Sequence, residues 1–303
     1  MKKILIVGGS GTIGSAFIKE FSDIYKFTSV ARNELLQADL KQKYPNVDIF
    51  MSDIESEDSL ITIFSKVKPD IVIHMAAMKH VNLAEENPIN ACRVNVLGSL
   101  NVISASIKTN VPMTIAISTD KACFPENVYG YSKSLMEHCF LNANTKNNKF
   151  AICRFANVTN TNGSVIPFWL SQKEKNESLK LTDKNMNRLM FSQKSAVNLI
   201  NDSVNYCENN GGGFIASSFM KSVNMYDLAK VISDDVEIVG LRPGERLDEK
   251  LISEKELPFT YIENNLILLK KELNLGENKL NEEYSSRTVD KMNEQDILEL
   301  ING

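Results

Sequence analysis

The chain opens with a short apolar run that leads directly into a glycine-rich turn and a helical pattern. Residues 3–7 have the nearly unbroken hydrophobicity of a central parallel strand. Glycines at positions 8, 11 and 14 then allow a tight turn, a close approach of the backbone to a pyrophosphate, and close packing of the helix on the strand. The helix N-terminus supplies amide donors to a phosphate. This stretch therefore predicts a dinucleotide-binding unit lined by Gly8, Ser10, Gly11, Thr12, Ile13 and Gly14.

Apolar runs and helical patterns alternate over the first half of the chain. This alternation predicts an α/β fold with a doubly wound, Rossmann-like parallel sheet. After residue 168 the chain becomes more polar, and its shorter elements indicate a smaller C-terminal lobe that closes over the sheet edge. We expect a dinucleotide-binding domain over 1–168, with 189–218 returning to it, and a substrate-binding lobe from 169–188 and 219–303. Further strands are expected at 27–31, 47–51, 70–74, 114–117 and 150–155.

The end of the second expected strand bears on which dinucleotide would bind. Arg32 and Asn33 stand where enzymes that use NAD usually place a carboxylate for the ribose hydroxyls. A cation suits the additional phosphate of NADP, so we favour NADP over the alternative of a solvated surface arginine. After the third strand, Asp53 and Ile54 are expected at the adenine, although Asp53 could equally cap a helix. After the fourth strand, the cofactor is expected to meet Ala76, Ala77 and Lys79.

A polar cluster follows the strand expected at 114–117. Thr119, Asp120 and Lys121 lie at its carboxyl end, which in an open parallel sheet is the edge where ligands bind. Tyr129 then opens a helical pattern, and Lys133 lies one turn further along the same face. A Tyr-x-x-x-Lys spacing alone often arises by chance on ordinary helices. In this position, after a dinucleotide-type glycine loop, it indicates catalytic function.

Composition limits the partners and the compartment. The net charge of −4 argues against nucleic acid as the main partner. The five cysteines are odd in number and widely spaced without a Cys-x-x-Cys, which is typical of thiols in a reducing compartment. No apolar run has the length of a membrane span, and the first residues lead into a strand and not a signal peptide. We expect a cytoplasmic protein without a metal site.

These motifs resemble the extended short-chain dehydrogenase/reductase family. Within it, the chain is similar to the polysaccharide-biosynthesis branch typified by inverting UDP-N-acetylglucosamine 4,6-dehydratases. The most specific carriers of the resemblance are the Thr-Asp-Lys triplet at 119–121 and the Arg-Pro-Gly-Glu segment at 242–245. The chain departs from the family pattern at 154–157, where Arg-Phe-Ala-Asn replaces Arg-Tyr-Gly-Asn, and at Asn162, where an arginine is expected. These departures lie where nicotinamide and sugar should meet, so they concern the exact substrate.

The resemblance implies a 4,6-dehydration of a nucleotide sugar in which NADP carries the hydride and is regenerated. Tyr129, activated by the Lys133 ammonium, would take the proton from the hydroxyl on carbon 4, while Thr119 holds that oxygen. Lys121 would abstract the proton on carbon 5 if burial keeps it neutral part of the time, and a protonated Asp120 would protonate the leaving hydroxyl on carbon 6. The alternatives are an epimerase or dehydrogenase acting on a nucleotide sugar, or a non-catalytic sensor of NADP(H).

The resemblance also implies contacts with the substrate and between subunits. Helices at 95–106 and 132–143 correspond to those that pair subunits in the family, and both carry apolar stripes, so a homo-oligomer is expected. The substrate-binding residues implied by the resemblance are Lys79, His80, Asn157, Val165, Arg188, Arg242 and Glu245.

Overall fold

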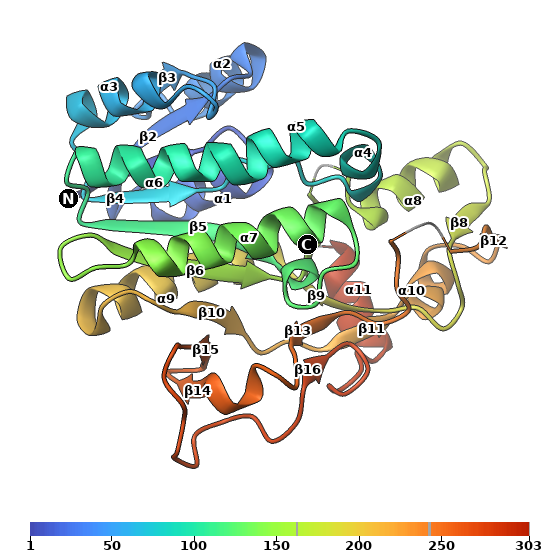
Figure 1. Ribbon diagram of the computed structural model, residues 1–303. Helices are drawn as coiled ribbons and strands as arrows, with labels where there is room; N and C mark the ends of the chain where they lie inside the picture. The colour runs from blue at the N-terminus through green and yellow to red at the C-terminus, as the bar shows by residue number, and fades with distance from the viewer. Residues whose placement is uncertain (162, 242–243, 303) are drawn as a thin grey trace.

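Buried strands form the centre of the molecule. A computed structural model describes residues 1–161, 163–241 and 244–302 of the chain. Within those residues a nine-stranded sheet has the order β14-β15-β10-β6-β5-β4-β1-β2-β3 (Figure 1). Its strands are β1 (Lys2–Val7), β2 (Tyr25–Ala31), β3 (Asp48–Met51), β4 (Ile71–His74), β5 (Met113–Thr119), β6 (Lys149–Phe155), β10 (Ile215–Ser218), β14 (Thr260–Glu263) and β15 (Leu266–Leu269).

In this order, the seven strands from β10 to β3 run parallel to one another. The chain builds the sheet outward from β1 through β2 to β3, and then returns through β4 to build the other half. The strand order therefore reverses between β1 and β4, and ligands of such sheets bind outside the carboxyl ends of the strands at that point. This arrangement confirms the predicted α/β class and its doubly wound sheet.

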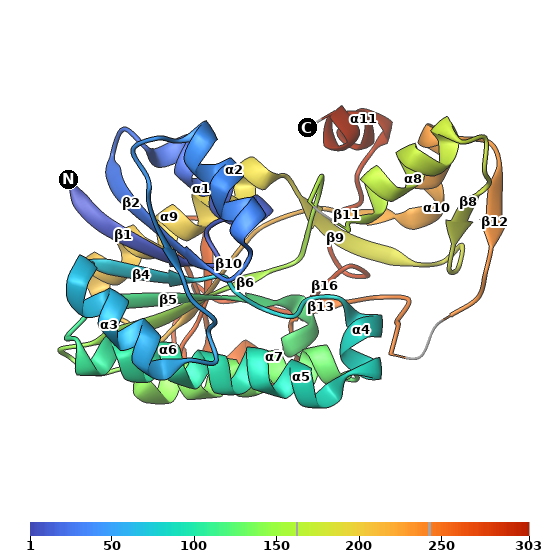
Figure 2. The same cartoon turned by 90° about the horizontal axis from the view of Figure 1, so that it is seen from above.

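Helices cover both faces of the sheet (Figure 2). On one face lie α1 (Thr12–Phe21), α2 (Glu34–Lys43) and α9 (Gln193–Asn210), and their buried residues join one hydrophobic cluster. On the other face lie α3 (Glu57–Val67), α6 (Gly98–Lys108) and α7 (Val128–Ala143), which share a second cluster. No helix in the described part of the chain combines the length and the apolar character needed to cross a membrane.

A smaller lobe lies beside the carboxyl edge of the sheet (Figure 2). It has its own hydrophobic cluster, in which Trp169, Leu228 and Ile297 are buried side chains. Its elements are β7 (Asn157–Val158), α8 (Val165–Glu174), β8 (Leu179–Leu181), β9 (Asn187–Phe191), β11 (Ser222–Asn224), α10 (Met225–Ile232), β12 (Val236–Ile238) and α11 (Glu294–Asn302). The pair β13 (Lys250–Ile252) and β16 (Tyr284–Ser285) instead adds its buried residues to the cluster on the α1, α2 and α9 face of the main sheet.

Short elements complete the chain around the sheet edge. They are α4 (Val81–Glu86), α5 (Pro88–Cys92), the π-helical stretch η1 (Arg93–Leu97), and the 3₁₀ turns η2 (Asp120–Ala122) and η3 (Leu257–Phe259). The helix expected over 95–106 thus begins as a π-helical stretch that runs into α6. π-Helical segments of this kind are frequent at functional sites.

One part of the expected domain division differs from the structure. The strands β14 and β15 come from the segment 219–303, which we expected in the smaller lobe, yet β15 pairs antiparallel with β10 in the main sheet. The apolar run Leu266–Leu269 is almost completely buried there. A strand that is apolar on both faces needs cover on both sides, and the main sheet provides it.

Candidate active site

The glycine turn after β1 lies against the end of β4. Gly8 has a φ of +92°, and a Cβ atom added to it would lie 2.8 Å from the Ala76 backbone nitrogen. The Ala76 amide in turn donates to the Val7 carbonyl at 2.9 Å. The backbones that follow β1 and β4 therefore meet with no room for a side chain at Gly8. The N-terminus of α1 follows this turn at the edge of the sheet. Gly8, Ser10, Gly11, Thr12, Ile13 and Gly14 all lie in this turn or in the first turn of α1, so the residues present fit a pyrophosphate.

The ends of β2 and β3 bring Arg32 and Asp53 together. Arg32 Nη1 lies 3.5 Å from Asp53 Oδ2, and both side chains are exposed, so the ion pair is weak and can be exchanged for contacts with a ligand. Asn33 caps α2, because its Oδ1 accepts a hydrogen bond from the Leu36 amide at 3.0 Å. Ile54 is buried. These four residues lie at or just after the ends of β2 and β3, and their contact with the adenosine half of a dinucleotide stays a prediction.

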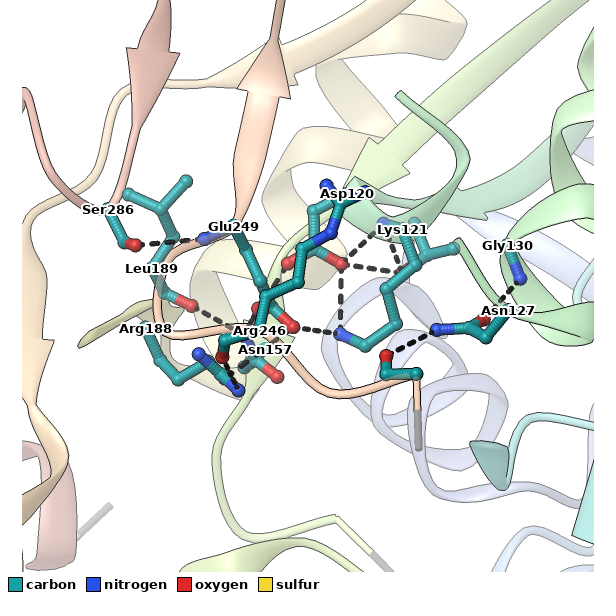
Figure 3. Close-up of polar contacts among 12 residues, drawn as sticks. Asp120, Lys121, Asn127, Gly130, Asn157, Arg188, Leu189, Arg246, Glu249 and Ser286 are labelled. Atoms are coloured by element: carbon teal, nitrogen blue, oxygen red, sulfur yellow. Dashed lines mark hydrogen bonds and ion pairs between the residues drawn. The ribbon is translucent and has the colours of Figure 1, made fainter. Parts of the chain in front are cut away.

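The polar cluster after β5 is built around the buried carboxyl group of Asp120 (Figure 3). Asp120 Oδ1 accepts hydrogen bonds from the Thr119 hydroxyl at 2.7 Å and from the Lys121 amide at 2.8 Å. The Lys121 ammonium lies 3.2 Å from the same oxygen. The turn η2 thus folds an acid and an ammonium onto each other directly after the strand, as the sequence predicted.

A second carboxylate, Glu249, completes the cluster and was not predicted from the sequence. It lies just before β13, and its Oε1 is 2.8 Å from Lys121 Nζ. Its Oε2 accepts a hydrogen bond from Asn157 Nδ2 at 2.8 Å, and Arg188 Nε lies 3.5 Å from Oε1. Glu249 therefore belongs to the cluster around Asp120. The only signal in the sequence is its place four residues after Glu245 in a charged segment.

These contacts set the protonation of the cluster. Burial, together with the facing Glu249 carboxylate, raises the pKa of Asp120 to about 6. Burial acts to raise the pKa of Glu249, but Arg188 and Lys121 outweigh it and hold that pKa below its usual range. Burial acts to lower the pKa of Lys121, but the carboxylates of Asp120 and Glu249 outweigh it and raise that pKa. The condition set for Lys121 to act as a base, that burial keeps it neutral part of the time, is therefore not met by burial alone.

Tyr129 and Lys133 lie on α7 beside this cluster. Burial raises the pKa of Tyr129 to about 12, and Lys121 is the neighbouring cation that opposes this rise. Lys133 is buried, its Nζ donates to the Ile117 carbonyl at 2.6 Å, and burial lowers its pKa to about 8. The cation that lowers the pKa of Tyr129 is thus Lys121, and the expectation that Lys133 does so beside a bound nicotinamide stays a prediction.

Asn95 is a buried residue whose contacts next to the candidate site were not predicted from the sequence. Its buried side chain accepts a hydrogen bond from the Met78 amide at 2.8 Å and donates to the Met78 carbonyl at 3.1 Å. It also donates to the Ser132 hydroxyl at 2.9 Å, next to Lys133. Asn95 therefore fixes the segment after β4 relative to α7. A lone asparagine in an apolar helical pattern gives no sequence signal for this role.

The other residues expected to bind substrate lie around the same edge. His80 packs against Gly163, which lies just before α8. A Cβ atom added at Gly163 would come within 2.5 Å of His80 Cε1. Val165 begins α8. Burial lowers the pKa of Lys79, which follows β4 with Ala76 and Ala77.

The predicted residues from the smaller lobe are partly engaged within the protein. The Arg188 guanidinium donates to the carbonyls of Asn187 at 2.8 Å and Arg246 at 2.9 Å. Glu245 follows Gly244, whose carbonyl accepts a hydrogen bond from Asn127 at the start of α7 at 3.0 Å. Arg242 and Asn162 lie outside the described residues. In the part of the chain that the structure covers, no His, Cys, Asp and Glu side chains form a cluster of three or more suited to a metal ion.

The doubly wound sheet with a tyrosine and a lysine on the helix after β5 defines a nucleotide-binding enzyme of the short-chain dehydrogenase/reductase type. Residues 4–270 match a family model described as polysaccharide biosynthesis protein, and the chain belongs to that family. A relative from Campylobacter jejuni, named UDP-N-acetylglucosamine 4,6-dehydratase (inverting), is 35% identical over 86% of this chain and 80% of its own length.

Two further comparisons cover almost the whole chain. A relative from Rickettsia bellii, named UDP-glucose 4-epimerase, is 30% identical over 99% of this chain and 95% of its own length. The X-ray structure of Pen from Bacillus thuringiensis superposes with a TM-score of 0.90 at 27% identity, covering 99% of this chain and 96% of that one. The family and the fold are thus shown, while the relatives' names include two different reactions.

Proposed function

We propose that the chain is a nucleotide-sugar 4,6-dehydratase. It would convert a UDP-N-acetylhexosamine to a 6-deoxy-4-keto sugar for the synthesis of a surface polysaccharide or glycan. The observation that carries the proposal is the pairing of Asp120 with Lys121 at the end of β5, next to Tyr129. Elimination of water requires an acid and a base in addition to the groups that serve hydride transfer. A simple reductase needs only the tyrosine, the lysine and a hydroxyl.

The first half of the reaction is the oxidation at carbon 4. NADP would accept the hydride from carbon 4 and later return it to carbon 6. Tyr129 would take the proton from the hydroxyl on carbon 4, and Thr119 would hold that oxygen. Because burial raises the pKa of Tyr129, the phenol needs nearby positive charge to act as a base. Lys121 is the cation that already lowers the pKa of Tyr129, and we propose that Lys133, one turn further along α7, adds to it when the cofactor is bound.

The second half is the elimination of water. The ketone at carbon 4 acidifies the proton on carbon 5, which Lys121 would take as a neutral amine. The raised pKa of Lys121 keeps its ammonium protonated, and Asp120 Oδ1, at 3.2 Å, can accept the proton. A single transfer therefore yields the base and the acid together, and the protonated Asp120 then protonates the hydroxyl that leaves carbon 6. Lys121 would return the new proton to carbon 5 as the hydride reaches carbon 6. The proton that Tyr129 took from the hydroxyl on carbon 4 would then replace the one lost in the water, which resets the site.

Binding of the substrate is proposed to involve residues from both sides of the sheet edge. Lys79 and His80 follow β4, whereas Val165 and Arg188 belong to the smaller lobe. Asn157 lies between them in direct hydrogen-bond contact with Glu249. Arg242 and Glu245 complete the proposed set. The two lobes would therefore enclose the nucleotide sugar between them.

The cofactor is proposed to be NADP. Replacing Arg32 with alanine is expected to weaken NADP binding about tenfold or more, because a charge-assisted contact with the additional phosphate is lost. NAD binding should change little. Calorimetric titration of both cofactors would measure this, with Lys26→Ala as control, since Lys26 is an exposed cation at the other end of β2. A wild-type protein that prefers NAD would show that the Arg32 interpretation is wrong.

A nucleotide-sugar epimerase is the second candidate function, because the Rickettsia bellii relative carries that name over almost the full length of the chain. An epimerase returns an isomer of equal mass, whereas a dehydratase product is lighter by one water. Mass spectrometry after incubation with UDP-N-acetylglucosamine and a panel of other nucleotide sugars distinguishes the two. A product of unchanged mass would replace our proposal. A protein that binds NADP but converts no sugar would instead favour the sensor.

We also propose that the protein forms a homo-oligomer through α6 and α7. Leu100 and Ile107 on α6 and Tyr131 and Leu135 on α7 are exposed although apolar, and the two helices lie side by side on one face (Figure 2). Burial of such a face between two copies would remove this apolar surface from water.

All five cysteines are free thiols in the structure, which supports our placement of the protein in the cytoplasm.

Charge placed on this face is expected to dissociate the oligomer. The double substitution Leu100→Glu with Leu135→Glu should reduce the mass measured by light scattering to that of one chain. The matched control is Leu275→Glu, because Leu275 is 92% exposed on a loop outside α6 and α7. A wild-type protein that is a stable monomer at micromolar concentration would exclude this interface.

A further inference from the structure

Two carboxyl groups face each other in the candidate active site although one of them has no assigned role. Asp120 and Glu249 come from opposite sides of the site, one after β5 and the other just before β13. Both are buried, with 2% and 7% of their surface exposed. Removing two like charges from water at one place is costly unless donors or a proton compensate. The structure shows which donors they share.

Two donors bridge the pair (Figure 3). Lys121 Nζ lies 3.2 Å from Asp120 Oδ1 and 2.8 Å from Glu249 Oε1. Asn157 Nδ2 lies 3.5 Å from Asp120 Oδ2 and 2.8 Å from Glu249 Oε2. Each carboxyl group thus uses one oxygen for the ammonium and the other for the amide. This arrangement holds the two groups against each other and fixes the position of Lys121 Nζ from both sides.

The surroundings distinguish the two carboxyl groups. Arg188 Nε lies 3.5 Å from Glu249 Oε1, and backbone carbonyls at 187, 246 and 247 hold that guanidinium in place. Glu249 also takes the shorter contact with Lys121. Asp120 instead has the Thr119 hydroxyl, and Tyr129 on α7 is its remaining titratable neighbour. Two carboxyl groups in unlike environments divide into one that stays ionised and one that carries the proton.

We infer that Glu249 is a positioning residue for the elimination step: it stays ionised, holds the Lys121 amine in place, and makes Asp120 the carboxyl group that carries the exchangeable proton. This inference rests on the proposed dehydratase function. Glu249 itself need not touch the sugar, since it acts through Lys121 and Asp120. The groups that face Asp120 and enter this balance are Lys121, Glu249 and Tyr129, and Arg188 enters it through Glu249.

The sign of the pH effect follows from the active form of the pair. Elimination needs a single proton shared between Asp120 and Lys121, so activity falls on the acidic side when both groups are protonated. The pKa of Asp120, raised to about 6, places that acidic limb. Removing the negative charge of Glu249 lowers the pKa of Asp120, and the acidic limb should therefore move to lower pH, by about one unit or more.

The test compares Glu249→Gln with the wild-type holoenzyme. We expect kcat to fall about ten- to a hundredfold with little change in KM, because the amine loses one of its two fixed contacts, and the acidic limb of kcat to move to lower pH. Glu249→Asp keeps the charge and should restore the limb. The control is Asp248→Asn, which removes the adjacent carboxylate, one that accepts hydrogen bonds from Asn187 and Ser286.

A second measurement does not depend on turnover. Carbon-13 NMR of labelled aspartate carboxyl groups, with Asp120→Asn for assignment, follows the titration of Asp120 with and without Glu249. A lower titration midpoint in Glu249→Gln supports the inference even if the protein proves not to be a dehydratase. An active dehydratase in which Glu249→Gln leaves both the midpoint and the acidic limb unchanged overturns it and leaves the proposed function intact. A raised KM at unchanged kcat would overturn it in favour of a substrate contact.

Discussion

The substitution Tyr129→Phe is expected to lower turnover by about a hundred- to ten-thousandfold, the usual contribution of a general acid–base group. The substitution removes the hydroxyl that takes the proton from carbon 4 but keeps the ring, so cofactor and sugar should still bind. The reaction should stop before any oxidation. A single-turnover experiment that follows the absorbance of reduced nicotinamide should therefore show no reduced cofactor in Tyr129→Phe.

A suitable control removes a phenol elsewhere in the main sheet. The Tyr261 hydroxyl on β14 donates to the Leu273 carbonyl at 3.2 Å, at the edge of the sheet that is remote from β5 in the strand order. Tyr261→Phe is expected to retain full activity. If Tyr129→Phe accumulated reduced cofactor at a rate near that of the wild type, another group would have to be the base for carbon 4.

The main sheet was predictable because its strands are short apolar runs joined by helical patterns. The strands β1, β2, β4, β5 and β6 begin and end within two residues of the predicted ranges. The hairpin of β14 and β15 was missed although the sequence carries a signal for it. Asn264 and Asn265 have φ values of 51° and 62°, which is the conformation of a tight hairpin turn, and asparagine is among the residues that adopt it most readily.

The site was predictable only as far as it is local in sequence. Asp120 and Lys121 follow one strand directly, and Tyr129 with Lys133 share one helix face, so spacing alone brings each pair together. Glu249 also belongs to the cluster, and its hydrogen-bond partner Asn157 lies 92 residues earlier in the chain. No periodicity in the sequence indicates such a contact. The protonation of Lys121 depends on this distant carboxylate. Burial alone therefore does not decide whether its amine is partly neutral, the condition set from the sequence for Lys121 to act as a base.

The substitution Asp120→Asn is expected to stall the reaction after oxidation at carbon 4. Asp120→Asn removes the proton source for the leaving hydroxyl but leaves Tyr129 and Lys133 in place. Oxidation at carbon 4 can still occur, whereas elimination should slow by about a hundred- to ten-thousandfold. The enzyme should then hold reduced cofactor together with a 4-keto sugar. A single-turnover experiment would show a rise in the absorbance of reduced nicotinamide that does not decay on the time scale of wild-type turnover.

Variants of Asp120 and Lys121, compared with Tyr129→Phe, distinguish a dehydratase from an epimerase or a dehydrogenase. Lys121→Met removes the base for carbon 5 and should stall at the same stage as Asp120→Asn, with reduced cofactor present. An epimerase or a dehydrogenase needs neither group for elimination. If both variants turned over at the wild-type rate while Tyr129→Phe were inactive, elimination could not be the reaction. The acid and ammonium that η2 folds together after β5 would then have no part in the chemistry, and the epimerase or dehydrogenase alternative would replace our proposal.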